Sequence, residues 1–383
     1  MVHINIDEIT IVILTDDTFK NSNAWRLYAM ETVHHIEKIL NIESLFGRGH
    51  WTSERNPQGY TRGKSYENLL PYFRIAYHDY ISNMGVIVKF SAQALCEYQQ
   101  RYLDTYGDEI HCFQILQLLN SFGYHARLSR IDIAADYINE GLSVDTIYKE
   151  LKEKNTVIRF SNGKRNPSTI HAVENDGTVE TFYVGKRGKN AKALLRVYDK
   201  KTEQLEKNRY SKLAQTCKNW VRFEGEFKTQ YAHDISDYLQ QIRTYEEQCS
   251  FLAKALTDKY SFYLLRDRKN TEYTQHLLEI ANGTSEFSFS RIDTRNHDLF
   301  STYNYLISGS GLLSFLYKVN AIWGRSGIED VLRCFEKELD SYTVTEDIHY
   351  WINKNAPEYI RMSRENVPFL CADEEITKAE KLF

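Results

Sequence analysis

Residues 127–137, RLSRIDIAADY, decide the fold class of this chain. Successive side chains of a β-strand point to opposite faces, so a strand that alternates between charged and apolar residues separates a core from a polar surface. The polar face carries Arg130, Asp132, Ala134 and Asp136, and the apolar face carries Ile131, Ile133 and Ala135. This alternation predicts a half-buried strand.

Two later stretches repeat the pattern. In 193–200, ALLRVYDK, the polar face carries Arg196, Tyr198 and Lys200. In 219–228, NWVRFEGEFK, the polar face carries Arg222, Glu224, Glu226 and Lys228. If these strands are neighbours in one sheet, their charged faces form a single site. That adjacency is a hypothesis, because sequence does not give strand order.

The remaining segments predict helices around such a sheet. Further strands are expected at 4–15, 84–90 and 180–185, and hairpins or loops at 46–64 and 155–178. Helices are expected at 23–42, 92–122 and 143–153, with Ser143 as N-cap of the last. After residue 233 helical periodicity dominates, at 234–257, 311–322, 326–341 and 345–354, with a polar link at 282–299. We expect an α+β fold: a mainly antiparallel central sheet flanked by helices in residues 1–235, then a mostly helical region, 236–383.

Composition narrows the class of protein. The 383 residues include 42% hydrophobic ones and carry a net charge of −4, which fits a packed core and excludes a uniformly basic DNA-coating protein. The six cysteines form no CxxC pair. The N-terminus lacks the basic segment of a signal peptide, and no stretch reaches membrane-spanning length. We therefore expect a cytoplasmic protein with reduced cysteines.

One segment is strongly basic despite the negative total. Residues 186–201 contain a single acid, Asp199, and seven cations: Lys186, Arg187, Lys189, Lys192, Arg196, Lys200 and Lys201. Seven positive charges minus one give +6, which suits contact with nucleic-acid phosphates.

The polar faces suit metal-assisted phosphoryl transfer. Clustered carboxylates bind Mg²⁺ or Mn²⁺, which neutralise charge on a phosphate, while a tyrosine hydroxyl attacks phosphorus to give a phosphotyrosine. A free tyrosine has a pKa near ~10, so Tyr198 needs help from Arg196 and Lys200. A plain interpretation stays open. In that interpretation the acids form a solvent-exposed face of the sheet. Tyr198 is then an ordinary packing or surface residue among the 27 tyrosines of the chain.

Other chemistries lack their motifs. The chain has no GxxxxGK[ST], HExxH or GxSxG sequence. It also lacks a His-x-His triplet, and the adjacent His34 and His35 would point apart on a helix. We expect these two histidines at the surface rather than in a metal site.

The ordered set RIDIAADY, TFYVGKRGKNAKALLRVYDKKTEQ and WVRFEGEFK resembles the replication initiation factor (Rep_trans) family over about residues 80–235. The resemblance implies Tyr198 as nucleophile, with Arg196 and Lys200 as phosphate contacts. It implies metal ligation by Asp132, Glu224 and Glu226, with Asp136 as a weaker candidate. The chain departs from the family where Lys186 replaces a common serine and Ala92 replaces glycine.

The resemblance further implies a metal-dependent enzyme that nicks and closes one DNA strand at a specific site through a 5′-phosphotyrosine. Such a reaction initiates rolling-circle plasmid replication or conjugative transfer, with DNA, a host helicase and a second copy of the chain as partners. Two alternatives stay open: a catalytically silent DNA-binding protein of the same fold, and a nuclease that uses water. The C-terminal region is expected to recognise the DNA site or bind a partner.

Overall fold

A computed structural model describes most of the chain. The described residues are 1–15, 19–66, 73–186, 188, 191–206, 212–281, 287–289, 299–308 and 310–344, with scattered positions between 348 and 369. The chain divides into two compact units, Met1–Ser290 and Arg291–Phe383. Residues 236–290, which the sequence groups with the C-terminal region, thus belong to the compact unit that holds the sheet.

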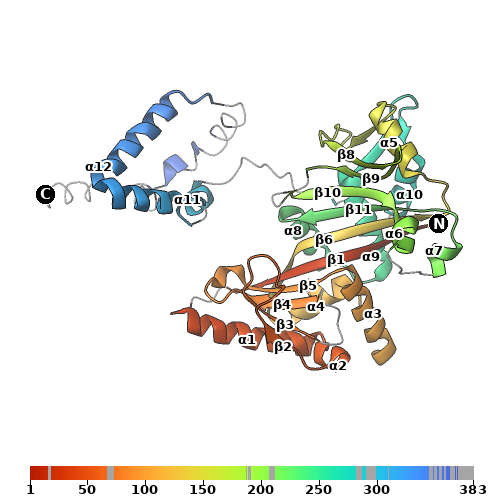
Figure 1. Ribbon diagram of the computed structural model, residues 1–383, viewed down its shortest axis with the longest axis horizontal. Helices are drawn as coiled ribbons and strands as arrows, with labels where there is room; N and C mark the ends of the chain where they lie inside the picture. The colour runs from red at the N-terminus through yellow and green to blue at the C-terminus, as the bar shows by residue number, and fades with distance from the viewer. Residues whose placement is uncertain are drawn as a thin grey trace. The chain divides into compact units, whose positions relative to one another are not determined.

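The first unit is built on a ten-stranded sheet whose described neighbours all pair antiparallel (Figure 1). In spatial order the strands are β2 (His50–Thr52), β3 (Arg62–Ser65), β4 (Phe73–Tyr77), β5 (Val86–Phe90), β1 (Val2–Leu14), β6 (His125–Ile138), β11 (Trp220–Lys228), β10 (Ala193–Asp199), β9 (Thr178–Val184) and β8 (Ile170–Asn175). The predicted α+β class with a mainly antiparallel sheet is confirmed.

The three strands with charged faces are neighbours, as hypothesised. Strand β11 lies between β6 and β10. Arg222 is opposite both Tyr198 and Asp136, and Glu226 is opposite Asp132. The polar faces therefore form one continuous surface across the middle of the sheet.

Helices cover the apolar face of this sheet. The core joins residues such as Ile131, Ile133 and Phe223 to apolar side chains of the helices. These helices are α1 (Ser22–Ile39), α2 (Ile42–Phe46), α3 (Ala92–Tyr106), α4 (Cys112–Ser121), α5 (Val144–Lys152), α8 (Gln230–Leu239), α9 (Tyr245–Lys259) and α10 (Glu272–Ile280). A Cβ at Gly225 would lie 2.7 Å from Leu256, so glycine here lets α9 pack closely on β11.

Two short helices cover one end of the polar face. They are α6 (Lys200–Glu206) and α7 (Lys212–Thr216). Ala214 and Cys217 pack against Ile138 and Trp220 in a small second core. A three-stranded sheet, in the order β13 (Lys269–Asn270), β12 (Ser261–Leu264) and β7 (Thr156–Arg159), completes the unit together with a single-turn 3₁₀ helix, η1 (Ser82–Met84).

Two predicted helices are each divided in the structure. The segment 92–122 breaks where Gly107 adopts a left-handed conformation, φ +77°, and closes α3. The segment 234–257 breaks between α8 and α9, where Thr244 caps α9 by accepting a hydrogen bond from the backbone of Glu247. Ser143 caps α5 as predicted, accepting from Thr146 N–H.

The second unit contains α11 (Leu299–Ser308) and α12 (Leu312–Asp340). Gly324 has non-helical angles, φ +68° and ψ −165°, so α12 is two helices joined at a kink, in agreement with the predicted pair 311–322 and 326–341. Most of the predicted link 282–299 and of the predicted helix 345–354 lies outside the described residues. Within the described residues, no helix is long and apolar enough to span a membrane.

Candidate active site on the central sheet

The hydroxyl of Tyr198 lies between the carboxylate of Glu224 and the ammonium group of Lys200. It donates a hydrogen bond to Glu224 Oε2 at 2.8 Å, and Lys200 Nζ donates to the hydroxyl oxygen at 3.3 Å. The guanidinium of Arg196 lies 3.8 Å from the centre of the tyrosine ring, within cation–π range. The three residues expected to act in catalysis therefore lie together with Glu224.

The strand-to-helix junction after Tyr198 creates this arrangement. Strand β10 ends at Asp199, whose carboxylate accepts a hydrogen bond from Thr202 N–H at 2.9 Å in the first turn of α6. Residues three apart on a helix are neighbours, and Glu203 holds Lys200 Nζ at 2.6 Å. The start of α6 thereby fixes the ammonium beside the phenol.

Electrostatics keep the phenol protonated at rest. Burial and the charge of Glu224 raise the pKa of Tyr198 well above its usual range, although Arg222 and Arg196 oppose the rise. Burial also raises the pKa of Glu224, and the carboxylate of Asp7 adds to that rise. A phenolate is therefore not present in advance, and the proton must leave as the oxygen reacts.

Arg222 organises the centre of the polar face. It binds both carboxylate oxygens of Asp136 at 2.7 Å and one oxygen of Asp7 at 2.5 Å. Trp220 Nε1 also donates to Asp136, at 2.6 Å. Asp136 is 3% exposed, and these partners give it a structural role in place of a free metal-ligating oxygen.

Arg130 gathers a second group of acids. It lies 2.6 Å from Asp132, 2.9 Å from Glu226 and 3.2 Å from Glu8. Burial raises the pKa of Asp132 to about 7, and the charges of Glu8 and Glu226 contribute, while Arg130 opposes the rise. The structure thus divides the four predicted metal ligands: Asp132 and Glu226 contact Arg130, Glu224 contacts Tyr198, and Asp136 contacts Arg222.

Two acids of the polar face are missed by sequence reasoning. The register of β1 on β6 shifts between Ile6 and Glu8, which leaves Asp7 as the extra residue of a β-bulge. Adjacent residues of a regular strand point to opposite faces, but here Asp7 and Glu8 both contact arginines of the polar face. The available signal is a pair of acids inside the apolar strand INIDEITIVIL.

The basic side chains expected to contact DNA lie in different surroundings. Lys186 is exposed just after β9, and Lys192 is half-buried. Lys201 Nζ donates to a main-chain carbonyl at 2.9 Å and so fastens α6 to the segment before β11. Arg187 and Lys189 lie outside the described residues.

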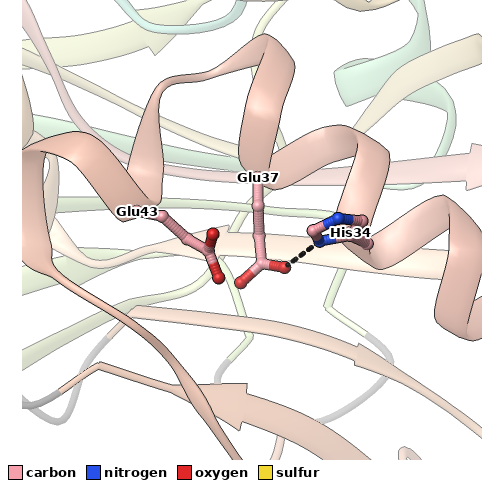
Figure 2. Close-up of side chains that lie close together, drawn as sticks. All are labelled: His34, Glu37 and Glu43. Atoms are coloured by element: carbon pink, nitrogen blue, oxygen red, sulfur yellow. Dashed lines mark ion pairs between the residues drawn. The ribbon is translucent and has the colours of Figure 1, made fainter.

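A separate group of possible metal ligands lies on α1 and α2. Figure 2 shows His34, Glu37 and Glu43 with their ligand atoms facing one another. The space is already used, because Lys64 Nζ lies 2.6 Å from Glu37 and 3.5 Å from Glu43. Tyr66 also donates to Glu37, at 2.5 Å. We interpret this group as a buried ion pair, with the imidazole of His34 at the surface as expected.

Fold and site together define an α+β protein whose central antiparallel sheet holds a buried tyrosine between a carboxylate and an ammonium. Residues 126–306 match the model of a family described as replication initiation factor, which confirms the resemblance inferred from the motifs. The match includes Tyr198 and Glu224 but not the bulge of β1. It supports initiation of DNA replication as the class of function.

Solved structures provide a further comparison. The rolling circle replication initiator protein from Geobacillus stearothermophilus is similar with a TM-score of 0.49 and 15% sequence identity, over 73% of this chain and 97% of that one. No curated protein matches the chain.

Proposed function

We propose that this protein cuts one strand of DNA and rejoins it through a covalent bond between Tyr198 and the 5′ phosphate, and so initiates rolling-circle replication or conjugative transfer. The observation that carries the proposal is the Tyr198 hydroxyl held between Glu224 and Lys200. The family match over residues 126–306 supports the same process and DNA as the partner.

The contacts of Tyr198 support a reaction in which its phenol proton passes to Glu224. Glu224 accepts the phenol proton as the Tyr198 oxygen bonds to phosphorus, and the bond from phosphorus to the 3′ oxygen breaks. The 3′ oxygen takes a proton from solvent and leaves as a free hydroxyl. Lys200 and Arg196 stabilise the negative charge that develops on the phenol oxygen and phosphate. Attack by a 3′ hydroxyl reverses the step and returns the proton to Tyr198.

A divalent cation fits beside this pair. Glu224 Oε2 accepts the hydrogen bond from Tyr198, so Oε1 can serve as a metal ligand. A bound cation would also relieve the repulsion from Asp7 that raises the pKa of Glu224. Glu224 and the second carboxylate oxygen of Asp7, whose Oδ1 pairs with Arg222, would hold Mg²⁺ or Mn²⁺, which prefer carboxylate oxygens. When bound, the cation supplies charge neutralisation at the phosphate. Asp132 and Glu226 would contribute only after release from Arg130.

The test is covalent trapping. A supercoiled plasmid carrying the protein's own gene region, or a labelled single-stranded library, is incubated with protein and Mn²⁺ or Mg²⁺ and then denatured. We expect label on the wild-type protein and none on Tyr198→Phe. Tyr183→Phe is the matched control, because Tyr183 lies opposite Arg196 on the neighbouring strand and should keep the adduct.

Other outcomes identify the alternatives. Metal-dependent cleavage without an adduct would indicate a nuclease that uses water, with Tyr198 structural. Binding of a mapped DNA site with neither cleavage nor adduct would indicate a catalytically silent DNA-binding protein. Either result overturns the proposal.

A further inference from the structure

A pocket of about 340 Å³ lies beside an unpaired edge of β1. Strand β5 pairs only with Ile9–Ile13 of β1, whereas β6 pairs with β1 from Val2 onward. Among the described residues, the start of β1 therefore has a strand on one side only. Asn5 and Ile6 line the pocket, directly before the bulge that sends two acids to the polar face. Asn5 also donates to Asp136 Oδ2 at 3.5 Å, so the pocket reaches the polar face that holds the candidate active site.

The walls of the pocket suit a flat, uncharged ring. Leu95, Leu103 and Ile110 supply apolar surface. Tyr245 is 40% exposed, and its ring stacks on His111, with centroids 4.3 Å apart and planes 18° apart. No lysine or arginine lines the pocket, and it carries an acid, Glu109, at 3.2 Å from His111, so a phosphate is disfavoured.

Three side-chain amides give the pocket both donors and acceptors. Asn5 Oδ1 is buried and accepts no hydrogen bond from the described residues. Gln248 is 4% exposed and uses its oxygen for Phe113 N–H at 3.2 Å, which leaves its amide nitrogen. Gln99 uses its nitrogen for the Ile110 carbonyl at 2.9 Å, which leaves its oxygen. Such amides pair with the edges of nucleobases.

We propose that this pocket binds an unpaired nucleobase of the DNA strand whose phosphate reaches Tyr198. The assignment of the base to DNA rests on the proposed function, whereas the chemistry of the pocket does not. Three strand spacings separate β1 from β10, or roughly 14 Å, so the base lies a few nucleotides from the scissile phosphate.

The test uses the full chain with Tyr198→Phe, so its outcome does not depend on nicking. The probe is the tightest single-stranded oligonucleotide selected from a random library, together with versions that carry one abasic nucleotide at each position. Cys96→Trp places a ring at the rim of the pocket on α3, and Gln93→Trp, exposed on the same helix outside the pocket, is the control. Binding is measured by fluorescence polarisation.

We expect one position at which the abasic nucleotide weakens binding about tenfold. Cys96→Trp should weaken binding of the intact probe to a similar degree. In that variant the abasic nucleotide should cause no further loss of affinity, because both changes remove the same contact. Gln93→Trp should bind as the parent does. In the parent protein, the intact probe should also protect the Cys96 thiol from alkylation, and the abasic probe should not.

The proposal would be overturned if the abasic nucleotide and Cys96→Trp weakened binding additively at every position. It would also be overturned if the intact probe did not protect Cys96 from alkylation. Saturable binding of a free nucleoside that is lost in Cys96→Trp, combined with additive abasic effects, would keep the base chemistry but reject DNA as its source. Equal weakening by Gln93→Trp would show that bulk on α3, not the pocket, controls binding.

Discussion

Glu224 and Asp136 lie on the same face of the sheet, yet their partners give them different chemistry. Glu224 accepts a hydrogen bond from a neutral phenol, so it can take up that proton. Asp136 accepts hydrogen bonds from the guanidinium of Arg222 and the indole of Trp220, and these contacts occupy both of its oxygens. The type of partner, and not the residue type, separates the reactive carboxylate from the structural one.

The pH dependence of adduct formation should follow Glu224. Activity is lost as the pH falls through the pKa of Glu224, since the protonated form cannot accept a proton. Burial and Asp7 raise this pKa and a bound cation lowers it, so at one saturating Mn²⁺ concentration Asp7→Asn, which removes a neighbouring negative charge, should move the acid limb to lower pH. The control is Asp176→Asn, at an exposed turn with φ +48°, which asparagine tolerates. An unmoved limb in Asp7→Asn would contradict the coupling.

Asp136→Asn should reduce stability. It leaves the buried Arg222 without its bidentate partner, and breaking such a pair costs about 3 kcal/mol or more. Urea unfolding followed by circular dichroism measures the loss, with Asp176→Asn again as control. A change below about 1 kcal/mol would mean that Asp7 alone satisfies Arg222.

At the scale of elements, period-two alternation was sufficient to predict β6, β10 and β11 and the sides that Tyr198 and Glu224 face. It could not predict the bulge at Asp7, because alternation assigns two adjacent acids to opposite faces unless the register shifts. The break at Gly107 was missed since apolar spacing continues across it. The contacts of Arg130 with Glu226 and Glu8 join strands that are distant in sequence, which no local pattern encodes.

The entry to β5 requires glycine. Gly85 has φ +66°, and a Cβ there would lie 2.2 Å from the carbonyl oxygen of Ile13. Gly85→Ala should therefore destabilise the protein by about 3 kcal/mol, from backbone strain and a clash with the main chain. Gly141 also has positive φ, +71°, but no atom within 4 Å of the added Cβ, so Gly141→Ala should cost about 1 kcal/mol. Equal losses of thermal stability in Gly85→Ala and Gly141→Ala would show that backbone strain, and not the clash with Ile13, determines the loss.

At the scale of the whole molecule, the first unit ends with aromatic residues that belong to its core. Phe287 packs edge-on against Phe251 of α9, and Phe289 stacks on Phe227 of β11. The helices of the second unit, in contrast, expose large apolar side chains such as Tyr317 and Trp323. The core of the sheet is therefore complete within the first unit.

Truncation should reflect this boundary. A chain that ends after residue 290 should unfold cooperatively, whereas one that ends after residue 281 loses both phenylalanines and should be less stable by about 3 kcal/mol or more. Scanning calorimetry compares the two with the full chain. If the longer fragment fails to show a cooperative transition, the second unit contributes to the folding of the first.

The ion pair between Asp7 and Arg222 can form only late in the synthesis of the chain. These residues are 215 positions apart, and β6 lies between their strands. At ribosomal rates, about ten to forty seconds pass between the emergence of one partner and the other. Until β11 emerges, β1 and β6 carry unneutralised acids, and the nascent chain has no Glu224 to accept the phenol proton. In the proposed reaction, a growing polypeptide would therefore be unable to cut the DNA from which its own message is being copied.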